Sequence, residues 1–137
     1  MKLHDVMTTE LEICPVTTPL TAAAATMRDC DIGDVLVRDE QGSVCGIVTD
    51  RDLVVRGLAG QADPTSMTLG DVCAKQLHTV DVDAGIDDVV KLMEDKALRR
   101  VPVMGGDDVV GIVSLGDLAE ALDRESALGQ ISAARPD

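Results

Sequence analysis

The chain of 137 residues contains an internal duplication, and this duplication limits the folds open to it more than any other feature of the sequence. Asp5 matches Asp71, which is a shift of 66 residues. Further along, Gly46–Leu53 (GIVTDRDL) matches Gly111–Leu118 (GIVSLGDL) with a shift of 65 residues. A repeat of this kind indicates two small units built on the same plan.

Each half predicts the same order of elements, β-α-β-β-α, after a short lead-in segment. Apolar residues with a period near 3.6 indicate the helices, and β-branched runs between turn residues indicate the strands. In the first half the lead-in is 3–7, the strands are 13–16, 35–38 and 44–49, and the helices are 20–27 and 50–58. In the second half the lead-in is 69–73, the strands are 79–82, 101–104 and 109–114, and the helices are 86–98 and 115–122. The predicted fold class is α/β, in the α+β sense, with two β-α-β-β-α repeats.

The repeats also set the expected domain boundaries. Residues 1–62 form the first repeat, residues 63–128 the second, and residues 129–137 a flexible polar tail. The segment 60–68 (GQADPTSMT) is rich in turn-forming residues and is the predicted linker. A unit of about 60 residues with three short strands is marginally stable alone, so the two copies are expected to pack along a shared apolar face.

The formal net charge of -13 and the absence of Phe, Tyr and Trp narrow the classes of partner. An acidic surface is repelled by phosphate backbones, and a chain without aromatic rings offers no platform on which bases stack. We therefore expect no direct contact with nucleic acid.

No apolar run reaches the roughly 18 residues of a membrane span, and the N-terminal MKLHDVMTTE lacks the apolar stretch of a signal peptide. The expected location is the cytoplasm, without attachment to a membrane.

The four cysteines are widely spaced, without a C-x-x-C pair or a zinc-finger spacing to His4 or His78. They are expected to be small buried hydrophobic residues of a protein in a reducing compartment. Cys14 stands beside Pro15 at a predicted strand start and is the cysteine to test for reactivity.

The duplicated segment contains T/S-x-x-D, with Thr49 and Asp52 in the first half and Ser114 and Asp117 in the second. This spacing is typical of a capping box, in which the hydroxyl and the carboxylate satisfy backbone N–H groups at the start of a helix. A carboxylate held at a helix start can also accept hydrogen bonds from both hydroxyls of a ribose. The spacing leaves both interpretations open, and they are compatible with each other.

These segments, together with Arg99–Val103 (RRVPV), resemble the tandem CBS (cystathionine β-synthase type) domain, or Bateman module. The resemblance covers roughly residues 3–123 and is strongest to stand-alone members of the mycobacterial hypoxic response protein type, which carry no attached enzyme or transporter. It implies two units packed with pseudo-two-fold symmetry and two clefts between them. Members of the family often hold AMP, ADP, ATP, S-adenosylmethionine or NAD(H) in these clefts, and many form homodimers.

By this resemblance, Asp52 and Asp117 bind ribose hydroxyls, while Thr49 and Ser114 bind ribose or phosphate oxygens beside them. The adenine ring would lie against aliphatic side chains and backbone groups at the strand ends. Those positions are Val16, Thr17 and Val35 in the first half and Val82, Asp83 and Val101 in the second. As strand residues, the valines fit a hydrophobic core at least as well.

Arg99 and Arg100 stand where the resemblance implies contacts with ligand phosphates, and a guanidinium suits phosphate oxygens. Pairing with surface carboxylates is the alternative. Asp34 takes the place of Arg100 in the first half and would repel phosphate if it faced a cleft. The first site is then either degenerate or selective for a less charged adenosine. Arg51, just inside a predicted helix, is a substitute phosphate ligand unless it is simply exposed.

The leading hypothesis is a non-catalytic regulatory module, with no required cofactor, that binds an adenine-containing ligand of the AMP, ADP and ATP class in the cleft between the repeats. An unknown regulated protein would respond to its occupancy. The sequence has no G-x-S-x-G, P-loop or H-E-x-x-H motif of an enzyme. The alternative is a ligand-free, stress-related protein-interaction module in which both T/S-x-x-D motifs are only helix caps. A thiol or metal sensor built on Cys14 or Cys73 with a histidine is the third hypothesis.

Overall fold

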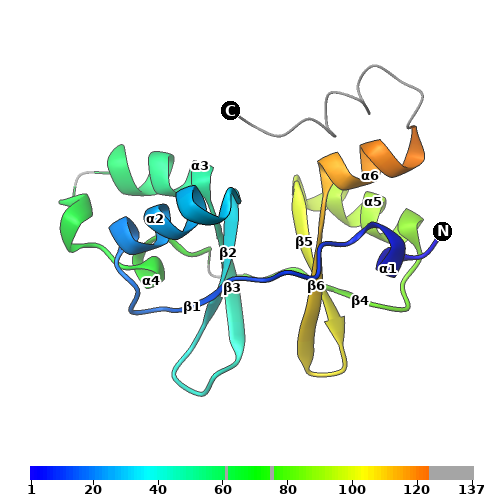
Figure 1. Ribbon diagram of the computed structural model, residues 1–137, viewed down its shortest axis with the longest axis horizontal. Helices are drawn as coiled ribbons and strands as arrows, with labels where there is room; N and C mark the ends of the chain where they lie inside the picture. Colours follow the sequence, from blue (N-terminus) through cyan, green and yellow to red (C-terminus); the bar gives the residue numbers. More distant parts are fainter. Residues whose placement is uncertain (61, 75, 124–137) are drawn as a thin grey trace. The chain divides into compact units, whose positions relative to one another are not determined.

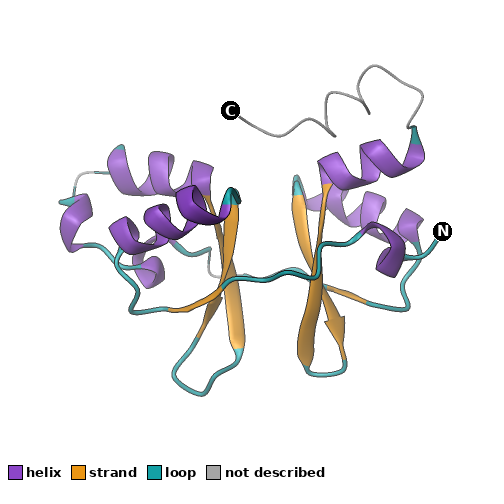
Figure 2. Cartoon of the chain, viewed as in Figure 1, coloured by secondary structure: helices purple, strands orange, loops and turns teal. Residues whose placement is uncertain are grey.

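The computed structural model describes residues 1–60, 62–74 and 76–123 and divides into two compact units (Figure 1, Figure 2). One unit comprises residues 11–77, and the other combines residues 1–10 with the chain from residue 78 onward. Each contains a three-stranded sheet with helices to one side of it, so the fold is the mixed α+β fold that the sequence predicts.

The unit of residues 11–77 follows the predicted order of one repeat and then adds two short helices. Its elements are β1 (Ile13–Pro15), α2 (Leu20–Cys30), β2 (Asp34–Arg38), β3 (Val44–Thr49), α3 (Asp50–Asp52), η1 (Leu53–Leu58), η2 (Pro64–Ser66) and α4 (Leu69–Val72). β1 is parallel to β2, and β2 is antiparallel to β3. Parallel strands need a crossover connection, and α2 provides it.

The second unit repeats this topology with its own sheet. Its elements are α1 (Leu3–Val6), β4 (Val80–Asp81), α5 (Ile86–Lys96), β5 (Arg100–Gly105), β6 (Asp108–Ser114) and α6 (Leu115–Leu122). β4 is parallel to β5, and β5 is antiparallel to β6. The β5–β6 hairpin turns at Gly106, which has φ of 67°. Glycine adopts this left-handed conformation without steric cost, which explains the turn at the predicted GGDD sequence.

The core of each unit is aliphatic, because the chain has no aromatic residue. In the unit of residues 11–77, Ala23 of α2 packs against Val35, Val37 and Val48 of the sheet, and none of these side chains is exposed. Residues two apart on a strand point to the same face, so the β2 valines share the face that α2 covers. The second unit places Val89, Val101, Val103 and Val113 in the corresponding positions.

The lead-in helices are exchanged between the sequence repeats. α4 precedes the second repeat in sequence, yet Leu69 and Val72 lie in the core of the unit of residues 11–77. α1 precedes the first repeat, yet Leu3 lies in the core of the other unit, where Thr8 pairs with Ile112 of β6. The compact units therefore do not coincide with the sequence repeats 1–62 and 63–128, because each unit contains the lead-in helix of the other repeat.

The predicted elements agree with the structure except at their ends and in one helix. The helix at 115–122 and the strand at 44–49 have the predicted bounds, whereas the helix from Leu20 continues to Cys30. The predicted helix at 50–58 is α-helical only at Asp50–Asp52 and becomes a π-helix at Leu53–Leu58. The predicted linker contains η2, a turn of 3-10 helix.

Two further expectations concern the tail and the membrane. The tail predicted at 129–137 lies outside the described residues. Over residues 1–60, 62–74 and 76–123, no helix has the length and apolar character needed to cross a bilayer.

Candidate functional site

The junction between β3 and α3 is a capping box, as the spacing of Thr49 and Asp52 predicts. The Asp52 backbone N–H donates to Thr49 Oγ1 at 3.1 Å, and the Thr49 backbone N–H donates to Asp52 Oδ2 at 2.9 Å. Thr49 has extended backbone angles, as an N-cap residue requires. Asp52 is thus held in one orientation at the end of a strand, with its side chain 20% exposed.

The junction between β6 and α6 repeats this geometry. The Asp117 backbone N–H donates to Ser114 Oγ at 3.0 Å, and the Ser114 backbone N–H donates to Asp117 Oδ2 at 3.2 Å. In both units the cap uses Oδ2 of the carboxylate. The cap therefore does not use Oδ1, and a second hydrogen bond from a ligand hydroxyl is compatible with capping.

The adjacent strand brings a charged residue to each capping box. Asp34 of β2 is the register partner of Thr49, and Arg100 of β5 is the register partner of Ser114. Each helix start is also tied to the residue before that strand. The Asp50 N–H donates to the Gly33 carbonyl at 2.9 Å, and the Leu115 N–H donates to the Arg99 carbonyl at 2.7 Å. These contacts bring Asp34, Arg99 and Arg100 to the T/S-x-x-D motifs of their own units.

Arg56 was missed by the sequence reasoning and lies beside Asp52. Its Nε is 3.9 Å from Asp52 Oδ1, and its Nη1 donates to the backbone carbonyl of Val72 at 3.3 Å. The spacing i, i+4 on a helix was the available signal. The π-helix that begins at Leu53 carries this residue, whereas Arg51, the substitute considered from the sequence, is exposed in α3.

The residues predicted to hold adenine fall into two groups. Val35 and Val101 are fully buried in the cores of their units, and Val16 and Val82 are partly buried against the same cores. Thr17 and Asp83 are exposed. The alternative interpretation of the valines as core residues therefore describes their packing, and any contact of theirs with a ligand stays a prediction.

A polar cavity borders Asp117. It has a volume of about 220 Å³ and is lined by Asp5, Val6, Met7, Thr8, Asp117, Glu120 and Ala121. α1 and the segment after it form one wall, and α6 forms the other. The second capping carboxylate thus opens onto a hollow within its own unit.

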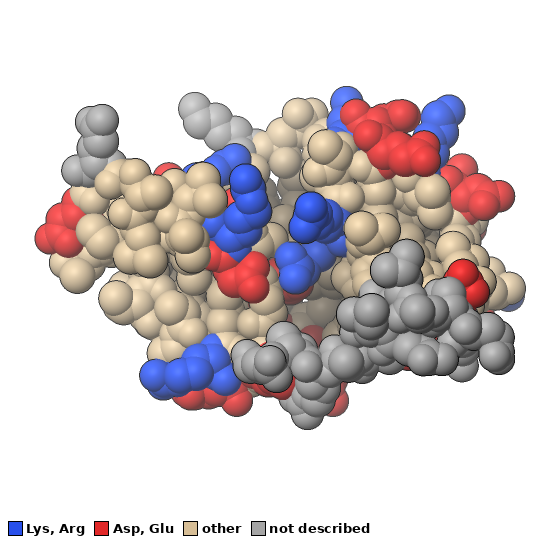
Figure 3. All heavy atoms as spheres, turned by 90° about the horizontal axis from the view of Figure 1, so that it is seen from above, with Lys and Arg blue, Asp and Glu red and all other residues tan. Residues whose placement is uncertain are grey.

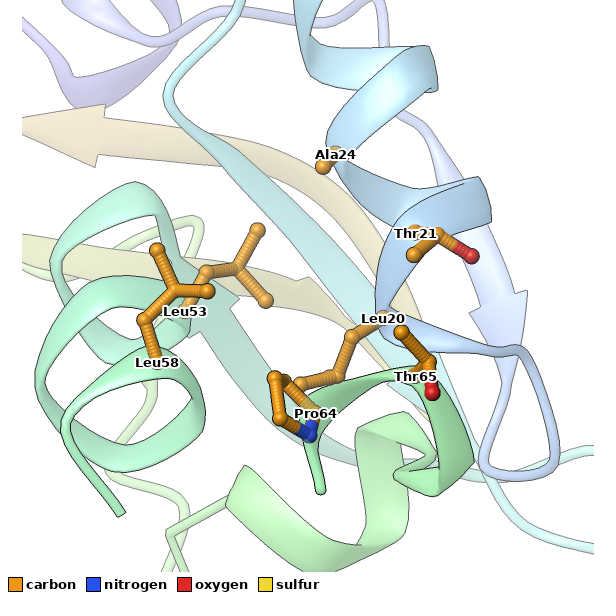
Figure 4. A pocket seen from close by; sticks show the side chains of 7 residues that line it. All are labelled: Leu20, Thr21, Ala24, Leu53, Leu58, Pro64 and Thr65. Atoms are coloured by element: carbon orange, nitrogen blue, oxygen red, sulfur yellow. The ribbon is translucent and has the colours of Figure 1, made fainter.

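A second cavity, of about 180 Å³, lies in the unit of residues 11–77 and is apolar. Leu20, Thr21, Ala24, Leu53, Leu58, Pro64 and Thr65 line it, from α2, η1 and η2 (Figure 4). None of the site residues predicted from the sequence lines this cavity, so it is separate from the candidate adenosine site.

Cys14, Cys45 and Cys73 are partly buried against the core, but Cys30 is exposed, so the expectation that all four cysteines are buried is wrong. Burial raises the pKa of Cys14, and the nearby Glu12 carboxylate raises it further. Burial likewise raises the pKa of Cys73, with smaller contributions from Cys45 and Asp52. A raised pKa leaves less of the reactive thiolate at neutral pH, which weakens the case for Cys14 or Cys73 as a sensor.

Metal-binding groups do not gather in the described part of the chain. Over residues 1–60, 62–74 and 76–123, no cluster of three or more His, Cys, Asp or Glu side chains is placed to hold a metal ion. On the face shown in Figure 3, acidic side chains lie in several places, with arginine and lysine side chains among them. No charged side chain among the described residues is buried.

The fold and the duplicated capping boxes define a tandem CBS domain, and the chain belongs to the CBS domain family, whose sequence profile matches residues 3–58 and 69–124. Proteins of this kind are generally non-catalytic regulatory modules.

Particular relatives share most of the chain's length. It is 42% identical to uncharacterized protein YlbB of Bacillus subtilis over 119 residues, which is 86% of this chain and 80% of that protein. It is 37% identical to hypoxic response protein 1 of Mycobacterium tuberculosis over 114 residues, 83% of this chain and 80% of that protein. The crystal structure of hypoxic response protein I with two coordinated zinc ions superimposes with a TM-score of 0.75 at 35% identity, covering 87% of this chain and 97% of that one.

Proposed function

We propose that this CBS protein binds an adenine-containing ligand of the AMP, ADP and ATP class at its two capping boxes and passes that occupancy to a regulated protein. The observation that carries the proposal is the repetition of one arrangement: a capping box whose carboxylate accepts one of the two cap hydrogen bonds, with an arginine at the same capping box in each unit. A fixed carboxylate accepts ribose hydroxyls without an entropic cost of ordering. Arginine near it favours the phosphate end of the same ligand.

The helix-cap role explains the local geometry without Arg56. A surface ion pair contributes only about 0–1 kcal/mol to stability, so the contact of Arg56 with Asp52 is not needed to hold the first cap. Regulation requires a ligand to bind two arrangements of the protein with different affinity. A coupling of about 1–3 kcal/mol is typical.

Ligand carried through purification gives the first test. The chain has no Trp or Tyr, so its own absorbance at 280 nm is very low. A nucleotide retained by the folded protein would absorb at 260 nm, and it would pass through a filter that holds back the protein only after denaturation had released it.

Calorimetry with AMP, ADP, ATP, S-adenosylmethionine and NADH then separates capping from binding. Asp52→Asn and Asp117→Asn keep an oxygen for the cap but remove the charge that a ribose uses. Each is expected to weaken binding at its own site tenfold or more. Asp71→Asn is the matched control, because Asp71 caps α4 with Thr68 in a third capping box outside the proposed site. If no ligand gives heat with the wild type, the proposal is wrong.

A protein-interaction module without a ligand is the second candidate, and exposed apolar side chains favour it. Val54, Val55 and Leu58 of η1 and Leu115 and Leu122 of α6 are each at least 46% exposed. Homodimerisation through one of these surfaces is compatible with ligand binding. Leu58→Asp and Leu122→Asp are expected to reduce the mass measured by light scattering from dimer to monomer if η1 and α6, respectively, carry the contact.

The third candidate is a metal or thiol sensor. Hypoxic response protein I was crystallised with zinc, but the described residues of this chain hold no three-residue ligand cluster. Metal analysis of the purified protein and titration of its thiols test this candidate directly.

The cytoplasm is the proposed location. Cys14, Cys30, Cys45 and Cys73 are free thiols, and Cys30 is exposed. Free thiols persist in a reducing compartment, where disulfide formation is opposed. Fractionation of cells that express the protein tests the location.

A further inference from the structure

The two capping boxes differ in where their basic residue comes from. In the second unit, Arg100 is the strand neighbour of Ser114, and in the first unit Asp34 takes that place beside Thr49. The first unit therefore has a negative charge at the position where the second unit has a positive one, and a negative charge repels phosphate.

The closing helix compensates for this loss. Arg56 lies four residues after Asp52, and its Nε is 3.9 Å from Asp52 Oδ1. Shifting by 65 residues places Ala121 at the same position of the second unit. Each unit therefore has an arginine at its capping box: Arg100 is the strand partner of the N-cap residue in one, and Arg56 of the closing helix lies beside the carboxylate in the other.

A backbone carbonyl holds the Arg56 side chain in place. Its Nη1 donates to the carbonyl of Val72, the last residue of α4, at 3.3 Å. Nη1 donates to Val72 and Nε lies 3.9 Å from Asp52 Oδ1, while Nη2 carries two N–H groups that can donate to a further acceptor. The side chain is 51% exposed, so a ligand can reach it. A guanidinium that is already oriented in this way loses less conformational entropy when it binds phosphate.

We infer that Arg56 is a specificity-determining residue of the first site, which recognises the phosphate of an adenine nucleotide whose ribose binds Asp52. The inference rests on the proposed function, and it is an alternative to the expectation that Asp34 makes this site degenerate or selective for a less charged adenosine. The first site prefers AMP to adenosine because of one side chain that has no equivalent in the second repeat.

The test measures the preference for AMP over adenosine by calorimetry. An Asp117→Asn background weakens the second site tenfold or more, so that the first site accounts for the tighter binding that is measured. In that background Arg56→Ala and Arg56→Gln are expected to weaken AMP tenfold or more and adenosine less than threefold. Gln keeps a donor for the Val72 carbonyl without the charge, and Arg56→Lys is expected to restore part of the AMP affinity. Arg28→Gln is the control, because Arg28 also pairs with an aspartate, Asp29, in the same unit but in α2.

The outcomes separate this inference from the proposed function. Equal losses of AMP and adenosine, or no loss of either, would show that Arg56 has only a structural role, and the inference would then be wrong while nucleotide binding stands. Failure of the Asp117→Asn protein to prefer AMP over adenosine would also overturn it. If the wild type binds neither compound, the proposed function fails, and the role of Arg56 fails with it. Retained adenosine binding in Arg56→Gln shows that the variant is folded.

Discussion

The sulfur of Cys73 occupies the space that a side chain on Gly46 would need: a Cβ atom built on Gly46 would overlap Cys73 Sγ. The second unit has the same relationship, since a Cβ atom on Gly111 would lie 2.6 Å from Met7 Sδ. The residue after each lead-in helix therefore packs its sulfur against a glycine of the third strand. This close approach explains why both third strands carry glycine.

The first prediction concerns this contact. Gly46→Ala is expected to reduce the free energy of unfolding by about 1–3 kcal/mol, because the new methyl group collides with a short, half-buried side chain. Cys73→Ala should rescue it, since the Cβ of residue 73 is 3.8 Å from the Cβ position of residue 46, an ordinary contact. Urea unfolding of both single variants and the double variant measures the coupling. Additive effects would contradict the prediction.

The second prediction concerns pH. Burial raises the pKa of the Cys73 thiol, so the folded protein keeps this proton at a pH where the unfolded chain has lost it. The contribution of Cys73 to stability is therefore complete below the unfolded pKa of about 8.5, and it is lost as the pH rises through the folded pKa. The free energy of unfolding should fall more steeply above about pH 8.5 in the wild type than in Cys73→Ala. Parallel pH curves for the two proteins would show that the thiol titrates normally.

The third prediction concerns the end of α5. Its C-cap, Ala97, has φ of 54° and ψ of 45°, a left-handed conformation that costs an L-residue with a Cβ about 1–2 kcal/mol. Ala97→Gly is expected to stabilise the protein by about 1 kcal/mol, as measured by thermal or urea unfolding.

The equivalent residue of α2 provides the comparison for this prediction. Asp31 has φ of 55°, but aspartate tolerates the left-handed region better than alanine. Asp31→Gly should therefore gain less than Ala97→Gly. A loss of stability in Ala97→Gly would mean that the alanine methyl group makes a contact worth more than the strain.

The elements and the caps could be predicted from the sequence because they depend on residues close together in the chain. The capping box joins Ser114 to Asp117 three residues later, and the helix that it starts has a regular apolar spacing to Leu122. Such local patterns indicate structure whatever surrounds them.

The exchange of lead-in segments and the role of Arg56 could not be predicted in the same way. Leu3 and Leu69 begin equivalent lead-in helices, so the sequence pattern alone does not decide which core each helix joins. Arg56 has no counterpart in the second half, so a comparison of the repeats, which identifies shared residues, does not identify it. Its contact with Val72 joins residues 16 apart, through a π-helical turn that the apolar period does not distinguish from an α-helix.

The fourth prediction separates the two faces of α6. Leu115, Leu118 and Leu122 recur at helical spacing along α6, but Leu118 is only 2% exposed and lies in the core of its own unit. Leu118→Ala is expected to cost about 2–5 kcal/mol in unfolding experiments. Leu115→Ala, at a position that is 51% exposed, should change the stability by no more than about 0.5 kcal/mol. Similar costs for the two variants would mean that Leu115 is also covered in solution.

The exchanged lead-in helices affect the order in which the protein can be completed during its synthesis. The first sheet is finished at Thr49, but its core lacks Leu69 and Val72 until the ribosome has made the start of the next repeat. The other core begins with Leu3, which is made first and must wait until β6 has been translated. Neither copy of the duplicated sequence, 1–62 or 63–128, would contain a complete core if expressed separately, whereas the continuous segment 11–77 contains every residue of the first core.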